Sequence, residues 1–165
     1  MRWRKSPLDP AVKEHLELHP KEKILAWVDD GSGRVVVASE TALHLQRTPP
    51  AYSRLGWEQV ERASYDSGTL TVVLVPEQGS ATLRIPVGDD GELPVVVRDR
   101  VTASVLVNRF VPLRGEAGVR IVGRRQENGQ VLWRSELDPG LADDAGARGE
   151  AAAALADVKA EVGEG

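Results

Sequence analysis

Short hydrophobic runs, separated by turn residues, dominate the N-terminal half of the chain. In several runs apolar and polar residues alternate, and Val35, Val36 and Val37 form a continuous β-branched stretch typical of a strand buried on both faces. Asp, Gly and Ser connect the runs, as in the tight turn at 66–68. The pattern predicts a β-meander whose strands are 24–30, 34–39, 42–46, 55–65, 69–75 and 81–87.

The run at 92–108 carries signals for both a strand and a helix. Its six valines favour a strand, because β-branched side chains have low helix propensity. The fourteen residues after Pro94 contain no Gly or Pro, however, which is long for a strand. Leu93, Val97 and Val101 also recur at steps of four, and Pro94 suits a first helical turn. We therefore predict a helix over 92–108 that closes the β-meander.

A second β unit is expected at 110–138. Its runs 118–126 and 130–137 flank Asn128-Gly129, and Asn-Gly between two β runs is the strongest short-range signal for a hairpin. The two strands are therefore predicted to pair with each other.

The two ends of the chain add helices. Asp9 and Pro10 suit the cap and the first position of a short helix at 11–18. An Ala-rich helix at 150–162 has a narrow apolar stripe, so it docks on another surface or frays. The expected organisation is an N-terminal segment at 1–22, a first β domain at 23–109, a hairpin extension at 110–138, and a linker with a C-terminal helix at 139–165, whose order the sequence leaves open.

Composition and charge narrow the expected function. The chain of 165 residues is 41% hydrophobic, enough for a buried core, and its formal net charge is −4. This acidic balance argues against nucleic acid, or an anionic membrane surface, as the main partner. Cys is absent, which excludes disulfides and thiolate sites. Because no apolar run is long enough for a transmembrane helix and no signal peptide is evident, we expect a cytoplasmic protein.

Several positions between residues 20 and 108 follow a known arrangement of strands and turns. They are Thr41, Leu43, Trp57, Val60, Tyr65, Gly68 and Leu70. In these positions the segment resembles the bacterial pleckstrin-homology-like (PH-like) domains. The resemblance implies a mainly β fold, a two-sheet barrel or sandwich, capped at one end by the helix 92–108 and followed here by the hairpin and the C-terminal helix.

The ligand chemistry of that family does not carry over with its shape. Members that bind phosphoinositides use Lys and Arg in the loop after the first strand. Here Asp29 and Asp30 occupy that loop, with Arg34 as the nearest cation in the sequence. Two carboxylates repel a phosphate at close range, and one guanidinium does not compensate both. The resemblance therefore implies shape without a basic lipid-binding loop.

The sequence offers no convincing catalytic, metal or cofactor site. His15 and His19 lie four residues apart on the predicted N-terminal helix without a further ligand nearby, which favours a solvated helix surface. His44 lies between Leu43 and Leu45 and is expected to be a partly buried sheet residue. Paired carboxylates fall in turns or linkers, where adjacent side chains rarely converge on one substrate atom. We therefore expect no enzyme and no cofactor.

One basic patch and one apolar stripe remain as candidate interaction surfaces. The patch lies on the predicted hairpin, where three arginines share one face, although Glu127 and Glu136 dilute it and a solvated face with ion pairs is the alternative. The stripe lies on the C-terminal helix. The candidate residues are Arg120, Arg124, Arg134, Trp133, Leu155, Val158 and Val162.

These observations lead to two functional hypotheses. The first is a non-catalytic interaction or scaffold module that binds a protein partner or a second copy of itself. The alternative is a protein that binds a small molecule or a lipid head group at the end of the barrel or in a cleft between sheet and helix.

Overall fold

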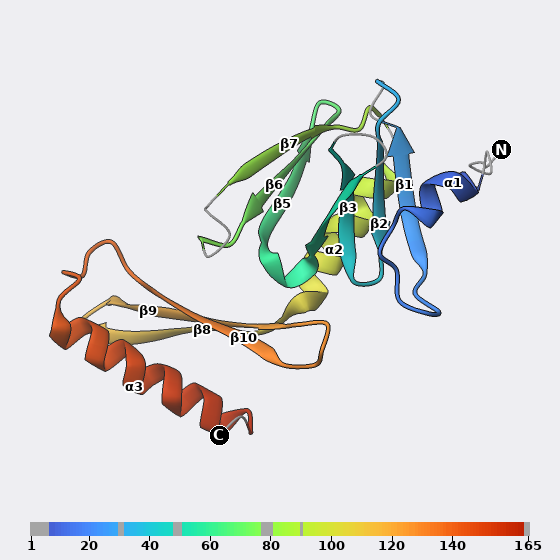
Figure 1. The fold of residues 1–165 in the computed structure, drawn as a ribbon. Helices are drawn as coiled ribbons and strands as arrows, with labels where there is room; N and C mark the ends of the chain where they lie inside the picture. Colours follow the sequence, from blue (N-terminus) through green and yellow to red (C-terminus); the bar gives the residue numbers. More distant parts are fainter. Residues whose placement is uncertain (1–6, 30–31, 48–50, 77–80, 90, 164–165) are drawn as a thin grey trace. The chain divides into compact units, whose positions relative to one another are not determined.

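The computed structural model describes residues 7–29, 32–47, 51–76, 81–89 and 91–163. The chain divides into two compact units, residues 1–103 and 104–165, which we call unit 1 and unit 2. The described strands form three antiparallel sheets, as Figure 1 shows. The mainly β fold predicted from the sequence is confirmed, but the described strands do not close into a barrel.

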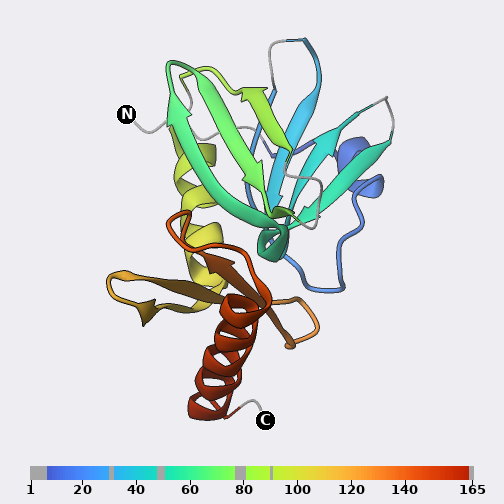
Figure 2. The ribbon, with the colours of Figure 1, turned by 90° about the vertical axis from the view of Figure 1, so that its left-hand side faces the viewer.

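Unit 1 contains two antiparallel sheets in which consecutive strands are neighbours (Figure 2). The first sheet consists of β1 (Ile24–Asp29), β2 (Val35–Ser39), β3 (Ala42–Gln46) and β4 (Tyr52–Gly56). The second consists of β5 (Val60–Asp66), β6 (Thr69–Leu74) and β7 (Thr82–Pro86). Each predicted run except one contains a single strand, which confirms the meander.

The exception is the run at 55–65, which the structure divides between the two sheets. A 3-10 turn, η1 (Trp57–Gln59), separates β4 from β5. The main-chain N–H of Trp57 donates to Thr41 O at 3.3 Å, and its indole Nε1 donates to Ser39 O at 3.1 Å. Because Trp57 is anchored at both points and is only 4% exposed, the chain turns here and begins the second sheet.

Helix α2 (Glu92–Ser104) supplies apolar side chains to the core of unit 1. Leu93, Val97 and Val101 are buried in the same cluster as Leu43 and Leu70, which come from the two sheets. Both sheets and the helix therefore share one hydrophobic core, as the predicted capping helix requires.

The helix ends four residues earlier than predicted. Strand β8 (Val105–Arg114) begins directly after Ser104, so the predicted helix 92–108 is wrong beyond that residue. Strand β8 pairs through its main chain with residues 117–124. The extended backbone of a strand also suits the β-branched Val105 and Val107. Pairing with a distant strand thus determines the secondary structure of a segment in which helical spacing and β propensity compete.

Unit 2 is a three-stranded sheet with one helix. Strand β9 (Ala117–Arg125) lies at the centre, between β8 and β10 (Val131–Leu137). The predicted hairpin is confirmed as β9 and β10, and Gly129 in its turn has a φ of +83°, which glycine adopts without strain. The sequence analysis missed the third strand, β8, because it assigned the start of that strand to a helix.

Helix α3 (Ala145–Glu161) covers one face of this sheet (Figure 1). It begins five residues before the predicted helix, because Asp144 caps it by accepting a hydrogen bond from Ala147 N at 2.8 Å. Ala151, Ala154 and Val158 pack against Val119 and Ile121 of β9. The narrow apolar stripe of α3 therefore packs against the sheet of its own unit.

The N-terminal helix is also shorter than predicted. Helix α1 (Pro10–Glu14) has the expected cap, since Asp9 Oδ1 accepts from Ala11 N at 2.9 Å. It ends at Glu14 instead of residue 18, and Leu16 beyond it is buried. Burial of Leu16 outside the helix explains why the apolar spacing over 11–18 was mistaken for two helical turns.

Two Val→Ala substitutions, one in α3 and one at the residue that follows it, test whether this helix is part of the core. Val158→Ala removes methyl groups from a side chain that is 2% exposed, and we expect it to lower the free energy of unfolding by about 1–2 kcal/mol. Val162→Ala, at a position 44% exposed, should change it by less than about 0.5 kcal/mol. Denaturant unfolding of both variants measures the difference. Equal effects would contradict the packing of α3 on the sheet.

Candidate functional site

A polar network ties the N-terminal segment to the turn between β2 and β3. Glu22 Oε1 accepts from Ser39 Oγ at 2.7 Å and from Thr41 N at 3.2 Å, and the Thr41 hydroxyl donates to the same oxygen. Its other oxygen accepts from His19 N at 2.9 Å. Burial raises the pKa of Glu22, but these hydrogen bonds together outweigh it and lower the pKa from 4.5 to about 2. The carboxylate is therefore charged at neutral pH.

His44 lies at the buried end of this network. It is 1% exposed, and its Nε2 is 3.1 Å from Ser39 Oγ. The Ser39 hydroxyl has one proton, and the charged Glu22 oxygen is its shortest acceptor, so we assign the Nε2–H of His44 as a donor to Ser39. Burial, and then the charge of Arg54, lower the pKa of His44, which keeps the ring neutral.

This Ser–His contact has the spacing of a nucleophile and its base, but not their arrangement. In a nucleophilic pair the serine donates its proton to histidine, whereas Ser39 donates to Glu22. Ser39 and His44 are both buried, so neither side chain presents an atom to a substrate in solution. The network holds the β2–β3 turn, and His44 is more buried than the sequence analysis expected.

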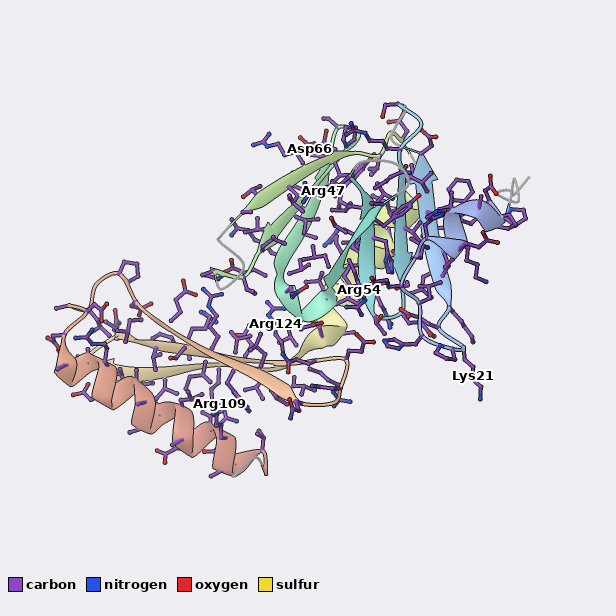
Figure 3. All side chains as sticks on the ribbon, viewed as in Figure 1. Lys21, Arg47, Arg54, Asp66, Arg109 and Arg124 are labelled. Carbon is purple, nitrogen blue, oxygen red and sulfur yellow. The ribbon has the colours of Figure 1, made fainter. Side chains whose placement is uncertain are left out.

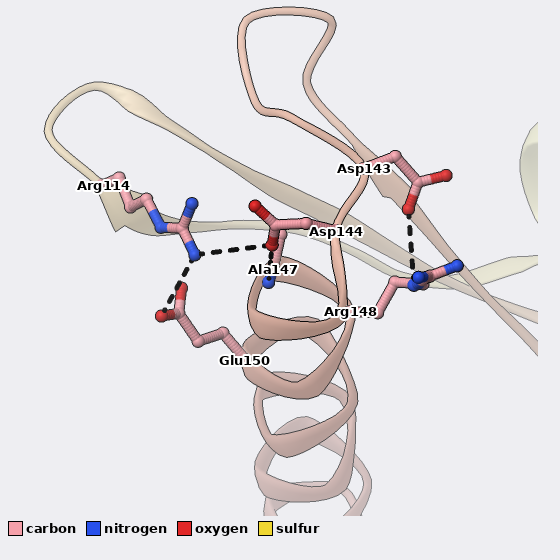
Figure 4. A network of polar contacts seen from close by, with 6 residues as sticks. All are labelled: Arg114, Asp143, Asp144, Ala147, Arg148 and Glu150. Carbon is pink, nitrogen blue, oxygen red and sulfur yellow. Dashed lines mark hydrogen bonds and ion pairs between the residues drawn. The ribbon is translucent and has the colours of Figure 1, made fainter.

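The other histidines and the paired carboxylates also have structural contacts. His15 Nδ1 lies 2.7 Å from Ala11 O at the end of α1. Among the described residues, no three His, Cys, Asp or Glu side chains gather closely enough to hold a metal ion. In the Asp143-Asp144 pair, Asp143 forms an ion pair with Arg148 at 3.6 Å and Asp144 caps α3 (Figure 4). Asp30 and Asp90, which complete the other two pairs, lie outside the described residues.

Arg114 joins the end of β8 to the start of α3. Its Nη2 lies 3.9 Å from Asp144 Oδ1 and 3.6 Å from Glu150 Oε1, as Figure 4 shows. The hydrogen bond from Ala147 N is the main cause that lowers the pKa of Asp144, and the Arg114 charge acts in the same direction. At the other end of the helix, Arg109 pairs with Glu161. These contacts align α3 along one face of the sheet.

The opposite face of the unit 2 sheet carries the predicted arginines. The β9–β10 register places Leu132 opposite Arg124, and Arg134 opposite Val122. Arg120, Arg124 and Arg134 therefore share the face that points away from α3. We call this surface the open face. Arg120 donates to Asn108 Oδ1 at 3.0 Å, and Arg124 donates to Ser104 Oγ at 3.4 Å (Figure 3 labels Arg124).

Strand β8 adds an aromatic residue that the sequence analysis did not place on this face. Phe110 lies directly opposite Arg120 in the β8–β9 register and is 40% exposed. On the other side of Arg120, the register places Glu136. The open face thus combines an exposed aromatic ring with a cluster in which arginine outnumbers glutamate. Phe110 was missed because its strand had not been recognised.

The remaining candidate residues lie on the α3 side, and the structure corrects the role expected for them. Trp133 packs against the α3 core, with Lys159 Nζ 5.8 Å from its ring centroid. Val158 is buried and Leu155 is partly buried against the same core. Val162 follows the last residue of the helix and is exposed, so it does not share the buried surface of Val158 and Leu155. The sequence left open whether this apolar stripe docks or frays, because β8, which it helps to cover, was missed.

A second arginine-lined site lies in unit 1, at one end of its two sheets. A cavity of about 490 Å³ is lined by residues of β2, β3 and β7 and by flanking positions. Arg34, Arg47 and Arg84 line it, and no acidic side chain does so among the described residues. Arg47 is labelled in Figure 3. The fold therefore brings Arg47 and Arg84, which are distant in the sequence, to the same cavity as Arg34.

One carboxylate of the preceding loop has a main-chain partner. Asp29 Oδ1 accepts a hydrogen bond from Gly33 N at 3.2 Å, which closes the end of the loop around Gly33. A carboxylate that accepts such a bond is partly neutralised locally, so it opposes an anion less than a bare one does. The expectation that this loop cannot hold an anion rested on Arg34 alone and did not include Arg47 or Arg84.

Comparison with family models, curated proteins and solved structures finds no match for this chain. No helix within the described residues is long and apolar enough to cross a membrane.

The Glu22 network makes a pH-dependent contribution to stability. Because the folded-state pKa is about 2 and the ordinary value is 4.5, the contribution is fully present above pH 4.5 and is lost as the pH falls towards 2. In Glu22→Gln this loss is absent, so the free energies of unfolding of wild type and variant should converge as the pH is lowered through this range. Urea unfolding at pH 2–6 measures both curves, and parallel curves would contradict the assignment.

Proposed function

We propose that the protein is a non-catalytic interaction module that binds a protein partner on the open face of unit 2. The observation that carries this proposal is the direct pairing of Phe110 with Arg120 on an exposed sheet face. Aromatic residues and arginine are enriched in protein interfaces, where they supply most of the binding energy. The hydrogen bond to Asn108 holds the Arg120 side chain in place before binding, and the strand register places Phe110 beside it.

The charge of this face indicates an acidic partner. Within the β9–β10 register it carries Arg120 and Arg134, together with the largely buried Arg124, which is 9% exposed, against the single Glu136. Arg134 Nη2 lies 4.0 Å from Glu136 Oε2, a separation that suits a loose, solvated pair. Complementary acidic groups on a partner would steer association and fix its orientation. With a net charge of −4 the whole chain does not favour a nucleic-acid backbone.

The architecture of unit 1 fits the same proposal. Seven strands in consecutive order form sheets of four and three strands, and α2 completes their core. This is the arrangement that the resemblance to PH-like domains implies, so we propose a PH-like fold for unit 1. Its most nucleophile-like pair, Ser39 and His44, is buried in a structural network, which supports a binding role over a catalytic one.

Site-specific photocrosslinking tests the open face. A photoreactive phenylalanine analogue at position 110 should form an adduct with a partner in cells, whereas the same analogue at Val95, which is 57% exposed on α2, should not. Arg120→Glu should reduce the adduct at least about 10-fold, because a buried interface arginine contributes 2 kcal/mol or more. The adducts are quantified by blotting and identified by mass spectrometry. An adduct of equal yield from both positions, or one insensitive to Arg120→Glu, would refute this surface.

A second candidate function is binding of a small anionic molecule or lipid head group in the unit 1 cavity. Arg34, Arg47 and Arg84 line one concave site, and no acidic residue lines it within the part of the chain that the structure describes, which favours phosphate or carboxylate groups. The volume of about 490 Å³ lies in the range of small-molecule sites. The cavity and the open face lie in different units of the chain, so evidence against one proposal is not evidence against the other.

Titration with inorganic pyrophosphate tests the cavity. Wild type should bind it, and Arg84→Glu should weaken binding at least about 10-fold, because one charge-assisted contact becomes repulsive. Arg62→Glu makes the same charge change on β5, outside the cavity lining, and should have little effect. Calorimetry measures both, and vesicles containing phosphatidylglycerol test a head-group source. An equal loss in the two variants, or no binding to either probe, would reject the site.

A further inference from the structure

Strand β10 forms an edge of the unit 2 sheet that has neither a bulge nor a proline to hinder strand addition. Its seven residues pair with β9 without a bulge, and it contains no Pro. The opposite edge, β8, has register shifts at Val105/Val107 and at Pro112/Arg114. Bulges and prolines are devices by which edge strands discourage further pairing. The contrast makes β10 the edge that can accept another strand.

The main-chain groups of β10 alternate in direction. Gln126 N donates to Gln130 O, and Asp138 N donates to Gly118 O, so even-numbered positions bond towards β9. In an antiparallel ladder the intervening residues direct their N–H and C=O groups to the other side. Ser135 and Leu137 therefore present their main-chain groups along the outer edge.

We infer that β10 pairs antiparallel with β10 of a second copy of the chain, about a two-fold axis at Ser135. In this register Arg134 lies opposite Glu136 of the second copy, and Glu136 lies opposite its Arg134, which gives two opposite-charge pairs. Shifting the axis to Arg134 or to Glu136 places like charges opposite each other. The order Arg-Ser-Glu along the edge thus selects one self-complementary register.

A groove beside this edge provides apolar surface for the same contact. It encloses about 560 Å³ between β10, the loop after it and α3. Leu137, Leu141 and Leu155 supply its apolar lining, and Asp138, Asp143 and Arg148 line it as well. With the axis at Ser135, Trp133 of the second copy lies opposite Leu137, on the face that the groove borders. Strand pairing then extends the sheet to six strands and covers an apolar groove in the same step.

This self-pairing goes beyond the proposed function, because it uses the edge of the sheet while the partner surface is its open face. Failure of one does not entail failure of the other. Arg120→Glu, which lies on β9, should therefore reduce the partner adducts formed from position 110 without changing the solution mass.

Solution mass across a wide concentration range tests the inference. Sedimentation equilibrium of the full chain should show a mass that rises from 17.9 kDa towards twice that value. Ser135→Pro removes an outward N–H without removing a bond to β9, so it should stay at the monomer mass, while Ser135→Ala should behave as wild type. Circular dichroism checks that each variant is folded.

A charge exchange provides the independent check. Glu136→Arg puts positive groups opposite each other and should remain monomeric, whereas the double variant Arg134→Glu/Glu136→Arg restores opposite-charge pairs and should regain the doubled mass. A wild-type mass of 17.9 kDa at all concentrations would overturn the inference. So would a Glu136→Arg variant that dimerises as wild type does.

Discussion

Each sheet in this chain has an apolar face that must be covered, and the helix available to cover it determines the rest of the structure. In unit 1 the two sheets and α2 close around one core, which contains Leu93, Val97 and Val101 from the helix. In unit 2 a single helix, α3, covers a single sheet. A single helix can cover only one face, so unit 2 has an open face and two edges that no described element of that unit covers.

This asymmetry explains where the proposed binding surfaces lie. On the covered face, small residues such as Ala151 and Ala154 let α3 approach Val119 and Ile121 closely. On the open face, the same strands carry Arg120 and Phe110. The alternation of side chains along β9 therefore produces a core and the proposed interaction surface from one strand. In unit 1, Arg34 beside β2, Arg47 beside β3 and Arg84 within β7 line one cavity.

Local signals in the sequence were sufficient where the decisive contacts are local. The Asn128-Gly129 turn fixes the β9–β10 register, and that register alone places Arg120, Arg124 and Arg134 on one face. The Asp9 cap and the strands of the meander were likewise accessible, because turn chemistry and alternation act over a few residues.

The errors arose where distant segments decide the outcome. Val105 continues the four-residue spacing of α2 but pairs with Arg124 of β9, so the helical pattern there was a coincidence. Trp57 interrupts a β run because its indole reaches Ser39 in another strand. Arg34, Arg47 and Arg84 are far apart in the chain, and only the tertiary fold brings them to one cavity. Missing β8 also hid Phe110 and left α3 without an evident partner.

The account depends most on α3 covering one face of a stable sheet in unit 2. Residue-resolved amide hydrogen exchange of the full chain tests this directly. We predict that the amides of Val119 and Ile121, at the centre of the covered face, exchange as slowly as those of Val37 and Leu43 in the core strands of unit 1. Rapid exchange at Val119 and Ile121 while Val37 and Leu43 remain protected would contradict the account, because the open face and its edges would then lack a folded support.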